Sequence, residues 1–341
     1  MRFVAWVALL LLLLGASACA PTRSLQDNWT PHQSTGAAPA GSVDLRLIVV
    51  IHGDADYTYH DSAGARLRAD REALKQVVEI ATTGSASEVF IFHQTSKPTY
   101  YHFRSGILVH RETYFPKENA YLADEAAFLH RDRDSSNAHT VLAYFGHEIP
   151  SGLRKGYFAS QRSKEFSLLQ FSEGLSRLGG GGLGKPYDLV ILSACYGGTP
   201  AILQSLTPLA NQVVASPAYL HLSYLNLRAL GSHSAGRAGG LADSVAAQSF
   251  AQLRTKTQTE ITVGIYEVNK IQGFLESPVA EAQILRTANG TKIKAEKWQD
   301  CSASAGFDST LAGQGVKLFY QPPRFGPLKN TATRSAWQCS Y

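Results

Sequence analysis

Between residues 44 and 285 the chain alternates between two kinds of segment. Short apolar runs rich in Val, Ile and Leu are typical of buried strands, and longer segments between them have apolar residues at helical spacing. Buried strands that are separated by helices become parallel neighbours, joined by right-handed crossovers. The sequence therefore predicts an α/β protein, a three-layer α/β/α sandwich around a mostly parallel central sheet.

The bounds of these segments follow from turn residues and from changes in the apolar period. Residues 99–115 alternate well enough to form an edge hairpin. The other expected strands cover 45–56, 88–94, 139–150, 187–195, 213–220 and 260–268, and the expected helices cover 63–83, 164–178, the first part of 198–212, 241–256 and 270–285.

The first 18 residues have the regions of a secretory signal peptide. Arg2 supplies the positive charge, an apolar run extends through Leu14, and small residues fill positions 15–18 before Cys19. Small residues directly before a cysteine resemble a bacterial lipobox, which implies that Cys19 carries lipid and begins the mature chain. Ala20 in the next position favours the outer membrane. The alternative is an ordinary signal peptide that is cleaved nearby.

Composition divides the chain into four regions. Residues 1–18 form the signal peptide, 19–42 a polar, Pro- and Ser-containing tether, 43–285 the α/β domain, and 286–341 a C-terminal extension. The extension is either a small β-rich cap or a separate interaction patch. The net charge of +5 comes from scattered Lys and Arg without a long basic run, so nucleic-acid binding is not predicted.

The remaining cysteines divide into a pair and a single thiol. Cys301 and Cys339 both lie in the extension, and in an exported protein a disulfide between them is the simplest pairing. Cys195 is then a free thiol, which is unusual in an oxidising compartment. Because it ends a buried strand, it is either a small apolar core residue or a nucleophile.

Three expected strands end in reactive side chains. His52, His147 and Cys195 each stand at the C-terminal end of a strand, the edge at which α/β sheets gather functional groups. A histidine at a neighbouring strand end can take the proton of a thiol and make it a nucleophile. One helical segment separates the strands of His147 and Cys195, which predicts adjacent strands and a Cys–His dyad. Gly197 and Gly198 would let backbone N–H groups approach an oxyanion.

Several segments resemble the clostripain family of caspase-like cysteine peptidases. Five segments occur in the order that the family shows. They are LRLIVVIHGDADYTY, ALKQVVEIATTGSASEVFIFHQ, the histidine strand HTVLAYFGHE, the nucleophile strand YDLVILSAC and the later strand EITVGIYEV. The resemblance implies a caspase-like fold and a cysteine endopeptidase that acts on protein or peptide substrates. It implies Cys195 as the nucleophile, His147 as its partner, and the backbone amides of Cys195 and Glu148 as oxyanion donors. The family can use calcium, although no calcium-binding loop or other metal-ligand set is evident here.

The sequence departs from the family pattern in the substrate pocket. A glycine precedes His147, whereas the family has its glycine after the histidine. Ser193 stands two residues before the nucleophile, where the family often has an aspartate that binds a basic substrate side chain. Asp54 and Asp56, which follow the first strand, are another source of that charge or simply a solvated turn.

The predicted substrate pocket has further members. His52 is expected to line it, together with Ser193 and with Ser216, where the strand after the nucleophile ends in Ala-Ser. Residues 151–166 form a basic, loop-like segment close to His147, and we expect self-cleavage after one of its Arg or Lys residues.

Other classes of function compete with a peptidase. A catalytically inactive caspase-like protein that serves as a binding scaffold in the envelope would have the same order of elements, and the displaced glycine and missing aspartate favour it. A serine hydrolase would need Ser234 in a nucleophile elbow, but GSHSAG lacks the first glycine of that motif and no buried strand precedes it. The ligand spacing of a metallohydrolase is absent.

Overall fold

The computed structural model describes only part of the chain. The predicted signal peptide, Cys19 and the tether lie outside the described residues, as do Asp54, Asp56 and the basic segment after Ile149. Cys301 lies outside them too, so its disulfide with Cys339 stays a prediction. The described residues are 43–52, 57–61, 63–84, 87–115, 120–133, 137–149, 166–179, 187–223, 225–231, 240–276, 298–300, 315–326 and 338–340.

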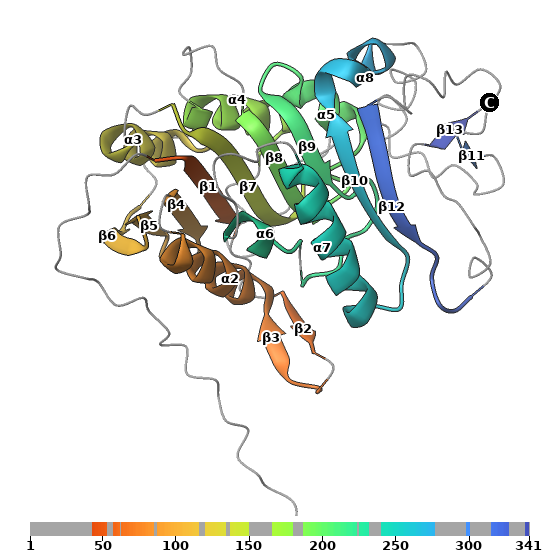
Figure 1. Ribbon diagram of the computed structural model, residues 1–341, viewed down its shortest axis with the longest axis horizontal. Helices are drawn as coiled ribbons and strands as arrows, with labels where there is room; N and C mark the ends of the chain where they lie inside the picture. Colours follow the sequence, from red (N-terminus) through yellow and green to blue (C-terminus); the bar gives the residue numbers. More distant parts are fainter. Residues whose placement is uncertain are drawn as a thin grey trace, which may run out of the picture. The chain divides into compact units, whose positions relative to one another are not determined.

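Within the described residues, nine strands form one sheet in the order β12-β10-β9-β8-β7-β1-β4-β5-β6 (Figure 1). Two separate two-stranded sheets are formed by β2 with β3 and by β11 with β13. The strands of the large sheet are β1 (Leu45–His52), β4 (Ser87–Gln94), β5 (Thr99–Arg104), β6 (Ile107–Thr113), β7 (His139–Glu148), β8 (Tyr187–Cys195), β9 (Ala210–Ala215), β10 (Ile261–Glu267) and β12 (Val316–Gln321). Those of the two small sheets are β2 (Thr58–His60), β3 (Arg66–Arg68), β11 (Trp298–Asp300) and β13 (Gln338–Ser340).

The centre of the sheet is parallel and its edges are antiparallel. Strands β4, β1, β7, β8 and β9 pair in parallel, whereas β5 and β6 on one side and β10 and β12 on the other pair antiparallel. The central strands are continuous apolar runs because both of their faces are covered: every residue of β1 is buried. The parallel strands therefore present their C-terminal ends together at one edge, as the sequence predicts.

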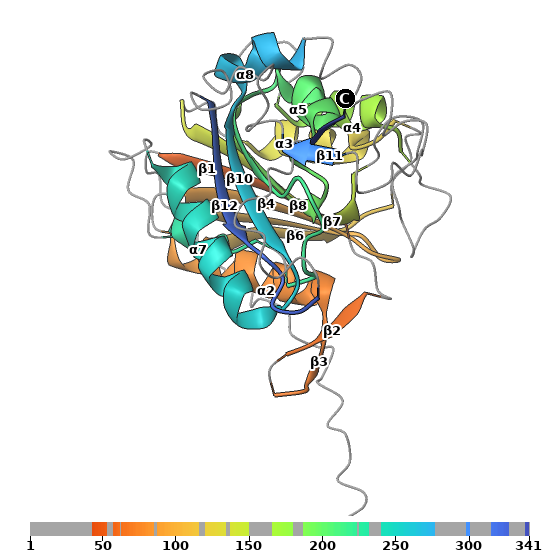
Figure 2. The same cartoon turned by 90° about the vertical axis from the view of Figure 1, so that its right-hand side faces the viewer.

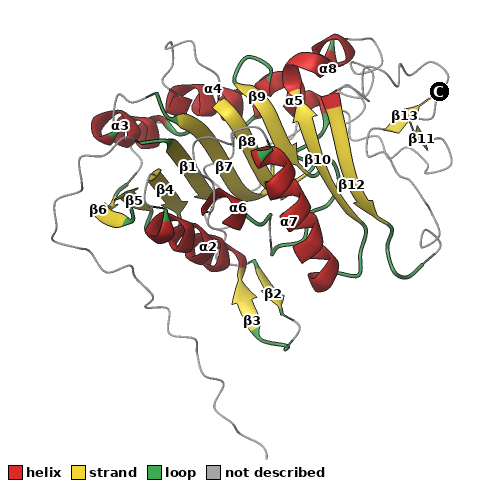
Figure 3. Ribbon diagram, in the orientation of Figure 1, coloured by secondary structure: helices red, strands yellow, loops and turns green. Residues whose placement is uncertain are grey.

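Helices cover both faces of the sheet, which confirms the predicted three-layer sandwich (Figures 2 and 3). One apolar core lies between the sheet and α2, α6 and α7, and the other lies between the sheet and α3, α4, α5 and α8. We call the face of the sheet under the first core the α2/α7 side, and the face under the second core the α4/α5 side. The helices are α2 (Ala69–Thr83), α3 (Ala123–Asp132), α4 (Leu168–Gly179), α5 (Pro200–Leu206), α6 (Arg228–Gly231), α7 (Leu241–Lys256) and α8 (Val268–Leu275).

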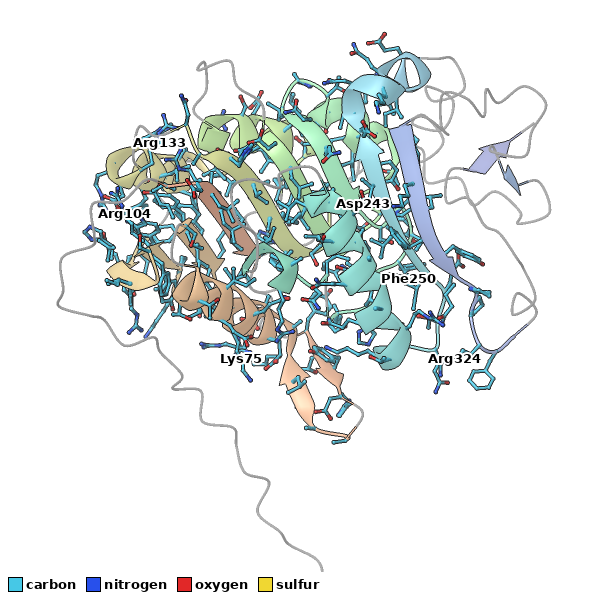
Figure 4. All side chains as sticks on the ribbon, viewed as in Figure 1. Lys75, Arg104, Arg133, Asp243, Phe250 and Arg324 are labelled. Carbon is cyan, nitrogen blue, oxygen red and sulfur yellow. The ribbon has the colours of Figure 1, made fainter. Side chains whose placement is uncertain are left out.

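The C-terminal extension supplies an edge strand of this sheet. β12 pairs with β10 along its whole length, and helix α7 packs against it. Lys317 forms an ion pair with Asp243, and the ring of Phe319 lies 5.8 Å from that of Phe250; Asp243 and Phe250 are labelled in Figure 4. The extension is therefore joined to the α/β domain by backbone pairing, an ion pair and ring contact.

The first helix begins later than its apolar spacing predicts. α2 begins at Ala69 rather than at residue 63, because Arg66–Arg68 form β3 and pair with β2. Leu67, the apolar residue that extends the helical pattern, instead stands opposite Tyr59 across this hairpin. The error is local, since Leu74, Val77 and Val78 are buried on α2 as their helical spacing predicts.

A buried hydrogen bond joins the sheet to the start of α2. His93 Nε2 lies 2.9 Å from Asp70 Oδ2, and the Arg68 guanidinium also bonds that carboxylate. Burial lowers the pKa of His93 below its ordinary value of 6.5. Burial alone would raise the pKa of Asp70, but the hydrogen bonds and charges of His93 and Arg68 outweigh it and lower the pKa below 3.8.

These shifts predict a loss of stability in acid. The unfolded chain binds a proton at His93 more readily than the folded one, so the free energy of unfolding falls as the pH drops below about 6.5. It falls further as Asp70 is protonated below about 3.8. Thermal melts of wild type and His93→Gln across this range will test the first step, with the exposed His60→Gln as control. Equal slopes for wild type and His93→Gln between about pH 7 and pH 5 would contradict it.

Candidate active site

An extra residue in β7 sets the geometry at the ends of β7 and β8. Phe145 stands opposite Ser193, and the next aligned pair is Glu148 with Cys195, so the bulge contains Gly146 and His147. A side chain at position 146 would meet the hydroxyl of Tyr144 at 2.5 Å, because that ring packs beneath it. Glycine therefore precedes the histidine for a packing reason.

Cys195 lies at the carboxyl end of β8, with its side chain in the core on the α2/α7 side. The residue is 8% exposed. The Leu220 N–H donates to Sγ at 3.3 Å, and Sγ lies 3.7 Å from the Leu220 carbonyl oxygen. Burial raises the pKa of the thiol; the Leu220 N–H opposes the rise and the negative charge of Glu148 adds to it. The sulfur is thus a protonated thiol at neutral pH and needs a base to react.

His147 stacks on Tyr57, with ring centroids 4.5 Å apart and planes 7° from parallel. Tyr57 packs against the same apolar core as Cys195, and its carbonyl accepts the Ala69 N–H at 3.0 Å, which fixes it to the start of α2. His147 and Cys195 therefore occupy neighbouring strand ends on the α2/α7 side of the sheet. The chain thus brings an imidazole and a thiol to the same edge of the sheet.

The turn after Cys195 is tied to the turn after β9. Tyr196 donates its N–H to the Ala218 carbonyl and Gly198 donates to the Ser216 carbonyl, both at 2.9 Å. The Gly198 N–H is therefore bonded within the protein, and the part of these glycines in an oxyanion site stays a prediction. Glycine is needed at position 198 for space, since a Cβ there would lie 2.5 Å from the Tyr266 hydroxyl.

The two predicted pocket serines are buried inside these turns. Ser193 is 0% exposed and its Oγ accepts the Leu225 N–H at 2.8 Å. Ser216 is also fully buried, and its Oγ accepts the Ala218 N–H at 3.2 Å. Both serines thus bind the backbone of the loop after β9, which passes Cys195. Their contacts are with backbone groups of the protein itself.

His52 lies on the opposite face of the sheet from Cys195. Its ring packs on the α4/α5 side, 5.5 Å from Phe166 and 6.0 Å from Tyr144, and the residue is buried. The structure therefore does not bring His52 together with His147 and Cys195, although both histidines end central strands. Side chains alternate between the two faces along each strand, and this alternation puts His52 on one face of the sheet and His147 on the other.

Sequence reasoning missed the aromatic residues around the thiol. Tyr57 supports His147, and Tyr196 and Tyr219 lie with their rings 4.9 Å apart beside Cys195. Tyr196 could have been recognised from the sequence, because it directly follows the cysteine. The other two tyrosines belong to loops whose path is set by contacts with distant strands.

The described residues contain no cluster of three or more His, Cys, Asp or Glu side chains that suits a metal ion. The calcium use implied by the family resemblance therefore finds no matching donor set there. In the same part of the chain, no helix is both long and apolar enough to span a bilayer.

Comparisons with known proteins show similarity of structure rather than of sequence. No protein-family model matches the chain, and no curated protein sequence does. A secreted C11 cysteine protease from Bacteroides thetaiotaomicron, solved with an irreversible peptide inhibitor, superposes with a TM-score of 0.55 at 12% identity, over 82% of this chain and 85% of its own. Iotapain, a secreted C11 cysteine protease from the same organism, gives 0.49 at 10% identity, over 80% of this chain and 74% of its own. The first of these superpositions carries the conclusion: this chain has the fold of the C11, or clostripain-family, cysteine proteases.

Proposed function

We propose that this protein is a cysteine endopeptidase with Cys195 as nucleophile and His147 as general base. The observation that carries the proposal is the pairing of the two strand ends, where Cys195 aligns with Glu148 and the His147 ring stacks on Tyr57 against the core that contains Cys195. The protease fold of the structural neighbour adds support. The raised pKa of the thiol fits a dyad in which proton transfer accompanies attack.

The proposed reaction is acyl transfer in two steps. His147 takes the Sγ proton as sulfur attacks the scissile carbonyl carbon, and the carbonyl oxygen becomes an oxyanion. The backbone amides of Cys195 and Glu148, which are aligned across β7 and β8, hold this charge. The protonated imidazole then gives its proton to the leaving amine, which leaves a thioester. Water, deprotonated by His147, hydrolyses the thioester and restores the thiol.

Thiol-reactive peptide probes test the proposal directly. Full-chain protein is incubated with peptidyl acyloxymethyl ketones that carry basic, apolar or small side chains next to the reactive group, with and without calcium. Mass spectrometry then locates the adduct. We expect modification at Cys195 that depends on the peptide portion and is lost on denaturation. Absence of any adduct across the series would contradict the proposal and leave a binding scaffold as the function.

We also propose that the chain is anchored to the bacterial envelope, in the outer membrane, through lipid on Cys19. The support is the sequence alone: an apolar run and small residues lead directly to this cysteine. Cells supplied with a labelled fatty acid should incorporate the label into wild type and not into Cys19→Ala. Equal incorporation by both would contradict lipidation at this residue.

A further inference from the structure

An exposed aromatic pair lies beside the sulfur of Cys195. Tyr219 is 75% exposed, and its ring meets that of the half-buried Tyr196 at 4.9 Å with planes 60° apart. A large apolar side chain that remains this exposed marks a candidate binding surface when it adjoins other aromatic groups.

Backbone contacts fix the position of this pair relative to the thiol. Tyr196 directly follows Cys195, and its N–H donates to the carbonyl of Ala218 at 2.9 Å. Leu220, on the other side of Tyr219, donates its N–H to Sγ at 3.3 Å. Both neighbours of Tyr219 are thus bonded to the end of the nucleophile strand. Tyr219 cannot move far without breaking one of these contacts.

The backbone at Tyr196 is in an unfavourable conformation. Its φ is +58°, in the left-handed region that favours glycine. Bulky residues adopt this region rarely, and such strain gathers at functional sites where the surrounding structure enforces it. Two hydrogen bonds enforce it here, because the Tyr196 N–H and carbonyl bond Ala218 and Thr199.

The two sides of the thiol differ in chemical character. On the β7 side, the negative charge of Glu148 adds to the rise in the pKa of the Cys195 thiol. The segment on the β9 side contributes Tyr219, Leu220 and the partly buried Leu222, which packs against the same core as Tyr196. Ser193, which stands where a charge for a basic side chain was expected, is buried and bonded to the Leu225 N–H. The β9 side therefore suits an apolar ligand group.

We propose that Tyr196 and Tyr219 form an apolar subsite that binds an aromatic or large aliphatic side chain next to the scissile bond of a peptide substrate. This inference rests on the proposed function. Aromatic rings offer such a side chain offset-stacked or edge-to-face contacts, and the backbone bonds of Ala218 and Leu220 fix the segment that carries Tyr219. The subsite selects peptides with Phe, Tyr or Leu at this position over those with Arg or Lys.

Matched peptides test the subsite in catalysis. Four fluorogenic peptides differ only at the residue before the scissile bond, which is Phe, Leu, Ala or Arg. Wild type should cleave the Phe and Leu peptides best, and Tyr219→Ala should lower kcat/KM for them about tenfold or more, mainly through KM. The Ala peptide should change little, and Tyr219→Phe should retain the preference. Phe115→Ala is the control, an aromatic 70% exposed that follows β6 at the far edge of the sheet.

A binding assay separates this inference from the proposed function. Full-chain Cys195→Ala is titrated with labelled Phe and Arg peptides, and fluorescence anisotropy reports binding. Tighter binding of the Phe peptide that is lost in Cys195→Ala/Tyr219→Ala supports the subsite even if wild type cleaves nothing, an outcome that contradicts only the peptidase. A preference of wild type for Arg, or an equal loss for all four peptides in Tyr219→Ala, overturns the subsite and leaves the peptidase standing.

Discussion

Replacing Cys195 by alanine is expected to abolish labelling by peptide probes and all peptide cleavage, and His147→Ala is expected to slow both by about 10²- to 10⁴-fold. In the proposed reaction the sulfur forms the bond to the substrate, so no other group can substitute for it. The histidine acts on a thiol whose pKa is raised by burial and by Glu148. Without this base, little thiolate forms at neutral pH, and the rate of His147→Ala should therefore increase with pH more steeply than that of wild type.

The dyad prediction has a matched control in the second histidine. His52 also ends a central strand, but it packs on the opposite face, beside Phe166 and Tyr144. Provided that melting temperatures show a folded protein, His52→Ala should keep the labelling rate within a few fold of wild type. A result in which His52→Ala loses labelling and His147→Ala retains it would assign the base to the other strand.

Replacing Glu88 by alanine is expected to lower the free energy of unfolding by about 3–5 kcal/mol. Its side chain is fully buried, the Arg46 Nε donates to its carboxylate at 2.9 Å, and His102 Nε2 lies 3.3 Å from the other oxygen. Burial alone would raise the pKa of Glu88, but these two partners outweigh it and lower the pKa, so the buried group is a carboxylate. Its removal leaves the buried guanidinium of Arg46 without this counter-charge.

Urea denaturation measures this loss, and two further variants show its cause. Glu173→Ala removes a carboxylate that pairs with Arg177 on the surface of α4, and it should cost less than about 1 kcal/mol. Arg46→Met/Glu88→Leu removes both charges and should recover most of the stability that Glu88→Ala loses. A loss in Glu88→Ala no larger than that in Glu173→Ala would show that the buried pair contributes little.

Much of the fold is encoded locally and could be predicted. The strands that end at His52, Gln94, Glu148 and Cys195 are recognisable because a strand buried on both faces must be apolar along its whole length. Their alternation with helices fixes parallel pairing, and parallel strands end at one edge. The sequence by itself therefore determined the architecture, and it placed one histidine and one cysteine at neighbouring strand ends.

Only the tertiary structure decided which groups meet at that edge. The bulge at Gly146 and His147 lies above the Tyr144 ring and brings Glu148 into register with Cys195, and no local sequence pattern predicts it. The burial of Ser193 and the position of Tyr219 beside the sulfur depend on contacts between residues far apart in the chain. Such contacts follow from packing and register, which local periodicity does not encode, because a shift of one residue turns a side chain to the other face.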